Sequence, residues 1–172
     1  TAPLGVPAIR FLLAGLVLAG FALVTEGRIP RPQTGSEWGI VSGLAMTGIF
    51  LYALCFFYGL KHINAGRGAL VVALTPVIVV LAAWFLGRER MTPLKLTGVV
   101  IAMAGCLTVI GSGNPLALLH GAVGIGEWLI LGCALCWTAY TFIGRRATKT
   151  LSPLAATLWA SLIGAALIGA TA

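Results

Sequence analysis

The chain contains no aspartate, and only four of its 172 residues are acidic. Charged residues make up 9% of the sequence, where a soluble domain carries roughly a quarter. Hydrophobic residues make up 59%, and the mean hydropathy is +1.04. These values exclude an ordinary soluble domain and favour a chain whose apolar surface is covered by lipid.

Several chemistries lack the motifs they need. Without aspartate there is no site for the metal–diphosphate chemistry of prenyl or phosphatidyl transfer, and no His-Glu-x-x-His is present, with His62 and His120 both in predicted loops. The absence of a P-loop leaves no visible basis for ATP coupling. Cys133-x-x-Cys136 has the spacing of a redox or metal site, but it lies in an apolar run without nearby histidine or acid, so packing is favoured. The sequence therefore predicts no enzyme, no metal and no cofactor.

What remains is a succession of apolar runs separated by short charged clusters. A helix needs roughly 20 apolar residues to cross the hydrocarbon core of a bilayer. We predict six such spans, at 7–25, 38–60, 67–86, 94–111, 126–144 and 153–172. The connection 112–125 is long and apolar enough to lie on the membrane surface. The predicted fold class is an all-α, polytopic bundle of membrane helices.

The basic residues give the bundle an orientation. Eight follow the first, third and fifth spans: Arg28, Arg31, Arg88, Arg90, Lys95, Arg145, Arg146 and Lys149. The opposite side has Arg10, Lys61 and Arg67. Because basic residues concentrate in cytoplasmic loops, the first set is predicted to be cytoplasmic in a cell (inner) membrane. The net charge of +7 lies in these connections rather than on one soluble face, so no nucleic-acid partner is expected.

Several stretches, in order, resemble the EamA-type family of the drug/metabolite transporter superfamily. They are Arg10-Phe11-Leu12-Leu13-Ala14, the run Ala69 to Leu86 around Leu74-Thr75-Pro76, Gly87-Arg88-Glu89-Arg90, Gly98-x6-Gly105, and Leu135-Cys136-Trp137-Thr138-Ala139-Tyr140. The resemblance covers essentially the whole chain. It departs from the family pattern at Arg67, where a small or apolar residue is usual, and at Ala160, which overlays Arg10 in a faint repeat without its charge.

The resemblance implies ten spans in two inverted five-helix repeats, of which this chain would hold the second to the seventh. Residues 1–111 would then be four spans of the first repeat, 112–125 a connecting loop, and 126–172 two spans of the second. Inverted repeats are a device of secondary transporters, because two equivalent conformations give alternating access. The implied function is secondary transport, in the expected direction of export, of small metabolites, amino acids or drugs.

Thr75 and Pro76 lie in the middle of the third predicted span. A proline there frees a backbone carbonyl, which something nearby must satisfy within a membrane. The functional interpretation is a kink beside a central substrate cavity. The alternative is a static kink, since prolines are frequent in membrane helices.

Four further side chains are candidates for substrate contact. Trp137 and Tyr140 lie on one face near the middle of the fifth span and could wall a cavity, with packing as the alternative. Tyr52 lies on a stripe of the second span where packing is favoured. Arg10 lies within the first span, where a charge is costly and often functional, or it reaches the interface by snorkelling.

Two alternatives to a transporter stay open: a structural or helix-packing membrane subunit and, with less support, an intramembrane enzyme. The expected partners are a small-molecule substrate and the lipid bilayer. Self-association, the coupling ion and the identity of the substrate are left open by the sequence.

Overall fold

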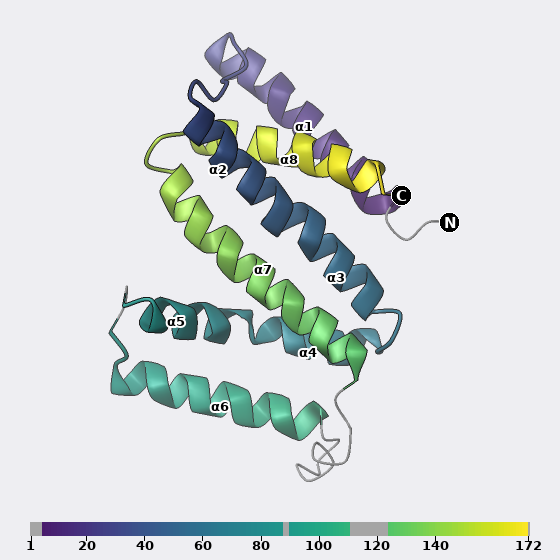
Figure 1. Ribbon diagram of the computed structural model, residues 1–172, viewed down its shortest axis with the longest axis vertical. Coiled ribbons are helices and arrows are strands. Elements are labelled where there is room, and N and C mark those ends of the chain that lie inside the picture. The colour runs from purple at the N-terminus through teal and green to yellow at the C-terminus, as the bar shows by residue number, and fades with distance from the viewer. Residues whose placement is uncertain (1–4, 88–89, 111–123, 172) are drawn as a thin grey trace. The chain divides into compact units, whose positions relative to one another are not determined.

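The computed structural model describes residues 5–87, 90–110 and 124–171, and within these ranges every regular element is helical (Figure 1). The connection predicted at 112–125 lies almost wholly outside the described residues. Four helical stretches are long and apolar enough to cross a membrane: Gly5–Glu26, Gly35–Gly59, Ala65–Phe85 and Ile125–Ala147. Shorter apolar helices cover Pro93–Gly105 and Pro153–Gly169. The predicted all-α, polytopic membrane fold is confirmed.

The starts and ends of these helices follow from local chemistry. Helix α2 (Gly35–Ala45) begins with a capping box, in which the Glu37 amide donates to the Thr34 hydroxyl and the Glu37 carboxylate accepts from the Thr34 amide. Helix α8 (Pro153–Gly169) begins after Ser152, whose hydroxyl accepts from the Ala155 amide. Helix α1 (Gly5–Glu26) is followed by Gly27, whose φ of 66° suits a glycine at a helix end.

Two predicted spans depart from a regular α-helix. The second contains a π-helical segment, η1 (Met46–Leu51), between α2 and α3 (Tyr52–Gly59). The third is two helices, α4 (Ala65–Ala73) and α5 (Thr75–Phe85), separated at Leu74. The sequence predicted a kink at this position, and the structure shows an interruption of one residue, Leu74, whose backbone stays right-handed (φ −75°, ψ −8°). The physical reason is that Pro76 has no amide hydrogen to donate across the join.

The chain forms two compact units, and the first comprises residues 1–54 and 139–172. In this unit α8 lies beside α1 and also packs against α2 and η1 (Figure 1). The buried face of α8 is made of small and aliphatic residues: Ala155, Ala156, Leu158, Ala160, Ser161, Gly164, Ala165 and Ile168. Its Trp159 donates from Nε1 to the Pro30 carbonyl (2.8 Å) and meets the edge of Trp38. Close packing through small residues is the usual way for helices to associate in a membrane.

The second unit comprises residues 55–138. It contains the end of α3, α4, α5, α6 (Pro93–Ile110) and most of α7 (Ile125–Ala147). Helix α4 packs against both α5 and α6. Many large apolar side chains of α1 and α6 are exposed, including Val24 and Leu94, which is the surface that contact with lipid requires.

Candidate functional site

The interruption between α4 and α5 is stabilised by the side chain of Thr75, a member of the Leu74-Thr75-Pro76 motif. In a continuous helix the residue at position 76 would donate to the carbonyl of Val72, but proline has no hydrogen to give. The Thr75 hydroxyl donates to that Val72 carbonyl instead, at 2.5 Å. The Leu74 amide also points to the carbonyls of Val71 and Val72. Thr75 thus supplies the hydrogen bond that the Val72 carbonyl would otherwise lack within the membrane.

Pro76 lines a groove of about 180 Å³ between α5 and α6. The walls are almost entirely apolar, with Lys95 as the one charged member of the set Pro76, Val77, Val80, Lys95, Gly98 and Val99. Gly98 leaves space here, because a Cβ on it would meet nothing within 4 Å. Trp137 of α7 is not among the residues that line this groove.

The two aromatic residues of α7 have different surroundings. Trp137, in the second unit, is 44% exposed. Tyr140, in the first unit, is half-buried, and its ring occupies the space that a side chain on Gly48 of η1 would need. Tyr140 therefore packs on the π-helical segment.

Tyr52 and Arg10 complete the predicted set, and both belong to the first unit. Tyr52 is half-buried at the start of α3, directly after η1. Arg10 is exposed near the start of α1, with its guanidinium 5.7 Å from the centre of the Phe11 ring. Because the predicted residues are divided between two units, a single cavity that joins them stays a prediction.

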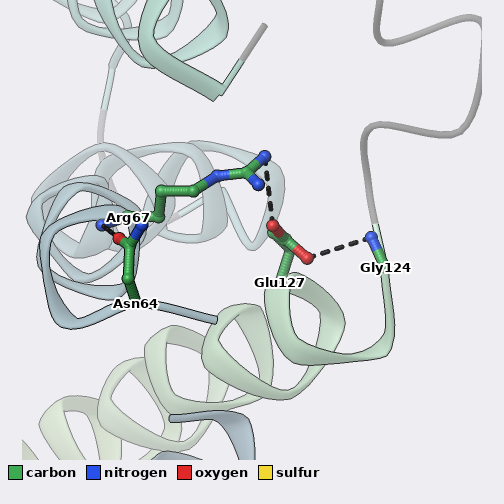
Figure 2. Close-up of polar contacts among 4 residues, drawn as sticks. All are labelled: Asn64, Arg67, Gly124 and Glu127. Carbon is green, nitrogen blue, oxygen red and sulfur yellow. Dashed lines mark hydrogen bonds and ion pairs between the residues drawn. The ribbon is translucent and has the colours of Figure 1, made fainter. Parts of the chain in front are cut away.

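A further polar contact was not predicted from the sequence. Arg67 Nη2 lies 3.2 Å from Glu127 Oε1, joining the first turn of α4 to the first turn of α7 (Figure 2). Glu127 is the one buried acid among the described residues. The signal for this pair was present: Arg67 departs from the family pattern, and Glu127 is the only acid on the side predicted to face outward. Sequence reasoning considered each residue alone.

Cys133 and Cys136, which the sequence favours as packing residues, differ in burial: Cys136 is half-buried. Cys133 is fully buried, and its thiol donates to the Leu129 carbonyl at a sulfur–oxygen distance of 3.7 Å. Cys55, Cys133 and Cys136 are not joined by disulfides.

These features define a multi-pass membrane protein whose third span is interrupted at its centre. The chain belongs to the EamA-like transporter family, whose model matches residues 1–111. The motif Leu74-Thr75-Pro76 and the segment that opens at Arg10 both fall within the matched residues.

Characterised and uncharacterised relatives agree with this membership. The chain is 31% identical over 156 residues to the uncharacterized transporter YyaM of Bacillus subtilis, covering 91% of this chain and 51% of that protein. It is 31% identical over 169 residues to the WAT1-related protein At3g02690, chloroplastic, of Arabidopsis thaliana, covering 95% and 39%. It is 26% identical over 151 residues to the aromatic amino acid exporter YddG of Ancylobacter novellus, covering 84% and 49%. No solved structure matches.

The chain spans about half the length of the curated relatives that it matches. The family description and the printed names of these relatives indicate a transporter rather than an enzyme.

Proposed function

We propose that the full-length protein is a secondary transporter that exports small metabolites, with amino acids as the first class to test. The observation that carries this proposal is the interrupted third span in a chain of the EamA-like family. Discontinuous helices in secondary transporters commonly expose backbone groups to a substrate near the bilayer midplane. Aromatic amino acids are included among the substrates to test because one relative, YddG, is named as their exporter.

The proposed substrate contacts are Thr75, Pro76 and Trp137 in the second unit, together with Tyr52, Tyr140 and Arg10 in the first. Thr75 has donated its hydroxyl hydrogen to Val72, so its oxygen stays available as an acceptor for a substrate donor. Trp137 offers an indole N–H and an aromatic face, which suits an ammonium or an aromatic side chain. The proposed mechanism is alternating access, in which two inverted repeats expose these groups to each side of the inner membrane in turn.

Counterflow in proteoliposomes tests the proposal directly. Full-length protein would be reconstituted with a panel of unlabelled amino acids inside the vesicles, and uptake of the matching labelled amino acid would be followed over time. We expect saturable exchange for at least one member of the panel, and competition by related members. Vesicles that exchange no amino acid, amine or drug above protein-free vesicles would contradict the proposal and favour a structural membrane subunit.

A further inference from the structure

In the ion pair between Arg67 and Glu127, the glutamate side chain is buried and the arginine side chain is partly exposed. The Glu127 side chain is 6% exposed, whereas the Arg67 side chain is 32% exposed. The second carboxylate oxygen of Glu127 accepts from the Gly124 amide at 2.9 Å (Figure 2). The carboxylate thus keeps one hydrogen bond of its own helix start whether or not Arg67 is in place.

The two charges suit their own helices differently. A carboxylate in the first turn of α7 is favourable, because the helix N-terminus carries a partial positive charge. Arg67 stands at the equivalent place in α4, three residues after the cap Asn64, where a positive charge is unfavourable for the same reason. Arg67 therefore gains nothing from the dipole of α4, and its ion pair with Glu127 joins the start of α4 to the start of α7.

A second contact lies close to this pair and has a different character. A Cβ on Gly126 would stand 3.2 Å from the Gly59 carbonyl, and one on Gly59 would stand 3.3 Å from the Gly126 carbonyl. The end of α3 and the start of α7 therefore touch backbone to backbone. This contact involves no charged side chains, so neither protonation nor hydration breaks it. It can therefore persist while the ion pair separates.

The two contacts join opposite sides of the predicted repeat boundary. Helices α3 and α4 belong to the first predicted repeat and α7 to the second, and the distribution of basic residues places both contacts at the outward end. Separation of the ion pair leaves Arg67 able to reach water, because a third of its side chain is already exposed. An ion pair of this kind can form in one conformation and separate in another, which an element that switches conformation requires.

We propose that Arg67 and Glu127 form an outer clasp, which closes the outward end of the transporter in one conformation and separates in the other, with the Gly59–Gly126 contact as its pivot. The inference rests on the proposed transport function, because a clasp has a role only if access alternates. It predicts that the pair must open once in every cycle.

Reversible cross-linking tests that requirement. Full-length protein carrying R67C and E127C, with Cys55, Cys106, Cys133 and Cys136 replaced by alanine, would be treated with a short bifunctional thiol reagent that a reductant cleaves. We expect amino-acid exchange in the counterflow assay to fall in proportion to the cross-linked fraction and to return on reduction. The same treatment should not affect the variant that carries R67C alone. Flux that persists in fully cross-linked protein overturns the clasp and leaves the proposed function intact.

A second measurement does not depend on flux. With Cys55 as the sole cysteine, one turn before Gly59, an impermeant thiol reagent added outside would report opening of the outward end. We expect E127Q to label at least about tenfold faster than the parent, because loss of the charge shifts the population toward the open state. Glu37→Gln is the matched control, since Glu37 also caps a helix start, that of α2.

Equal labelling of E127Q and the parent overturns the clasp. A protein that exchanges no solute, yet in which E127Q and not E37Q accelerates labelling, overturns the proposed function and leaves Arg67–Glu127 only as a contact that closes the outward end.

Discussion

At the scale of single residues, the most informative side chains are Thr75, for its hydrogen bond, and Trp137, for its exposure. Thr75 is committed to the backbone of its own span through the Val72 carbonyl. Trp137 is 44% exposed in a helix where Cys133 and Ala134 are fully buried. The first of these is a structural role that the structure describes, and the substrate role of the second stays a prediction.

The role of Trp137 is tested by Trp137→Ala in the full-length protein. If Trp137 contacts substrate, we expect a marked loss of transport with expression, insertion and melting temperature close to those of the parent. Trp128→Ala is the matched control, because Trp128 lies on the same helix and is 65% exposed. A packing role would instead lower the melting temperature, since truncation removes the contacts of the buried part of the side chain. Unchanged kinetics with lowered stability would contradict the substrate role.

The role of Thr75 is tested by comparing Thr75→Val with Thr75→Ser. Valine keeps the shape but removes the donor to Val72, so we expect a loss of about 1–3 kcal/mol in the free energy of unfolding. Serine keeps the hydroxyl and should cost less. Thr97→Val is the control, because the Thr97 hydroxyl bonds the Leu94 carbonyl at 2.9 Å within the uninterrupted helix α6. Thermal unfolding in detergent would measure all three, and equal effects at positions 75 and 97 would argue against a special role at the interruption.

At the scale of elements, the π-helical segment η1 is positioned by bulky side chains that enter the space above glycines. Tyr140 of α7 packs on Gly48 of η1, and Ile49 of η1 packs on Gly164 of α8. A π-helix widens one turn of a span and is frequent at functional sites. Because Gly48 and Gly164 have no side chains, α7 and α8 can approach this widened turn closely within the first unit.

The contact between η1 and α8 is tested by Gly164→Ala. A Cβ at this position would lie 2.7 Å from Ile49 Cβ, which is fixed to the backbone and cannot move aside. We expect a destabilisation of about 1–3 kcal/mol from overpacking. Gly169→Ala on the same helix is the control, because a Cβ there meets nothing within 4 Å. Addition of Ile49→Ala to G164A should recover part of the loss of melting temperature, and a failure to recover would mean that the strain arises elsewhere.

At the scale of the whole molecule, the distribution of basic residues is the strongest organising feature. Eight bases follow alternate spans, and three lie on the other side. This asymmetry predicts the orientation of every span, and the proposed outward position of the Arg67–Glu127 pair depends on that prediction. Sidedness therefore supports both the repeat interpretation and the clasp.

The orientation is tested by alkylation of single cysteines in whole cells. Cysteines at Arg31, Arg90 and Lys149 should be protected from an impermeant reagent added outside, whereas Lys61→Cys and cysteines at 114–120 should react. Permeabilised cells give the control, since all positions should then be labelled. The reverse pattern would overturn the topology, and with it the outward position of the clasp.

The site is less readable from the sequence than the fold, and particular residues show why. Thr75 and Pro76 were found as a motif because proline has one strong and local effect on a helix. The capture of the Val72 carbonyl by Thr75 depends on the backbone geometry at the break, which the residue types alone do not state. The packing of Tyr140 on Gly48 joins residues far apart in the chain, and no periodicity within either helix indicates the register between them.

The sequence by itself determined that this protein crosses a membrane and about where its apolar helices lie, because hydropathy acts through the solvent and needs no partner. The orientation of the spans stays a prediction from the basic residues. The family membership likewise follows from the order of local motifs. The tertiary structure decided which residues meet: Tyr140 with Gly48, Ile49 with Gly164, and Arg67 with Glu127. These are contacts between helices, and their energies depend on distance, burial and register, which exist only once the chain has folded.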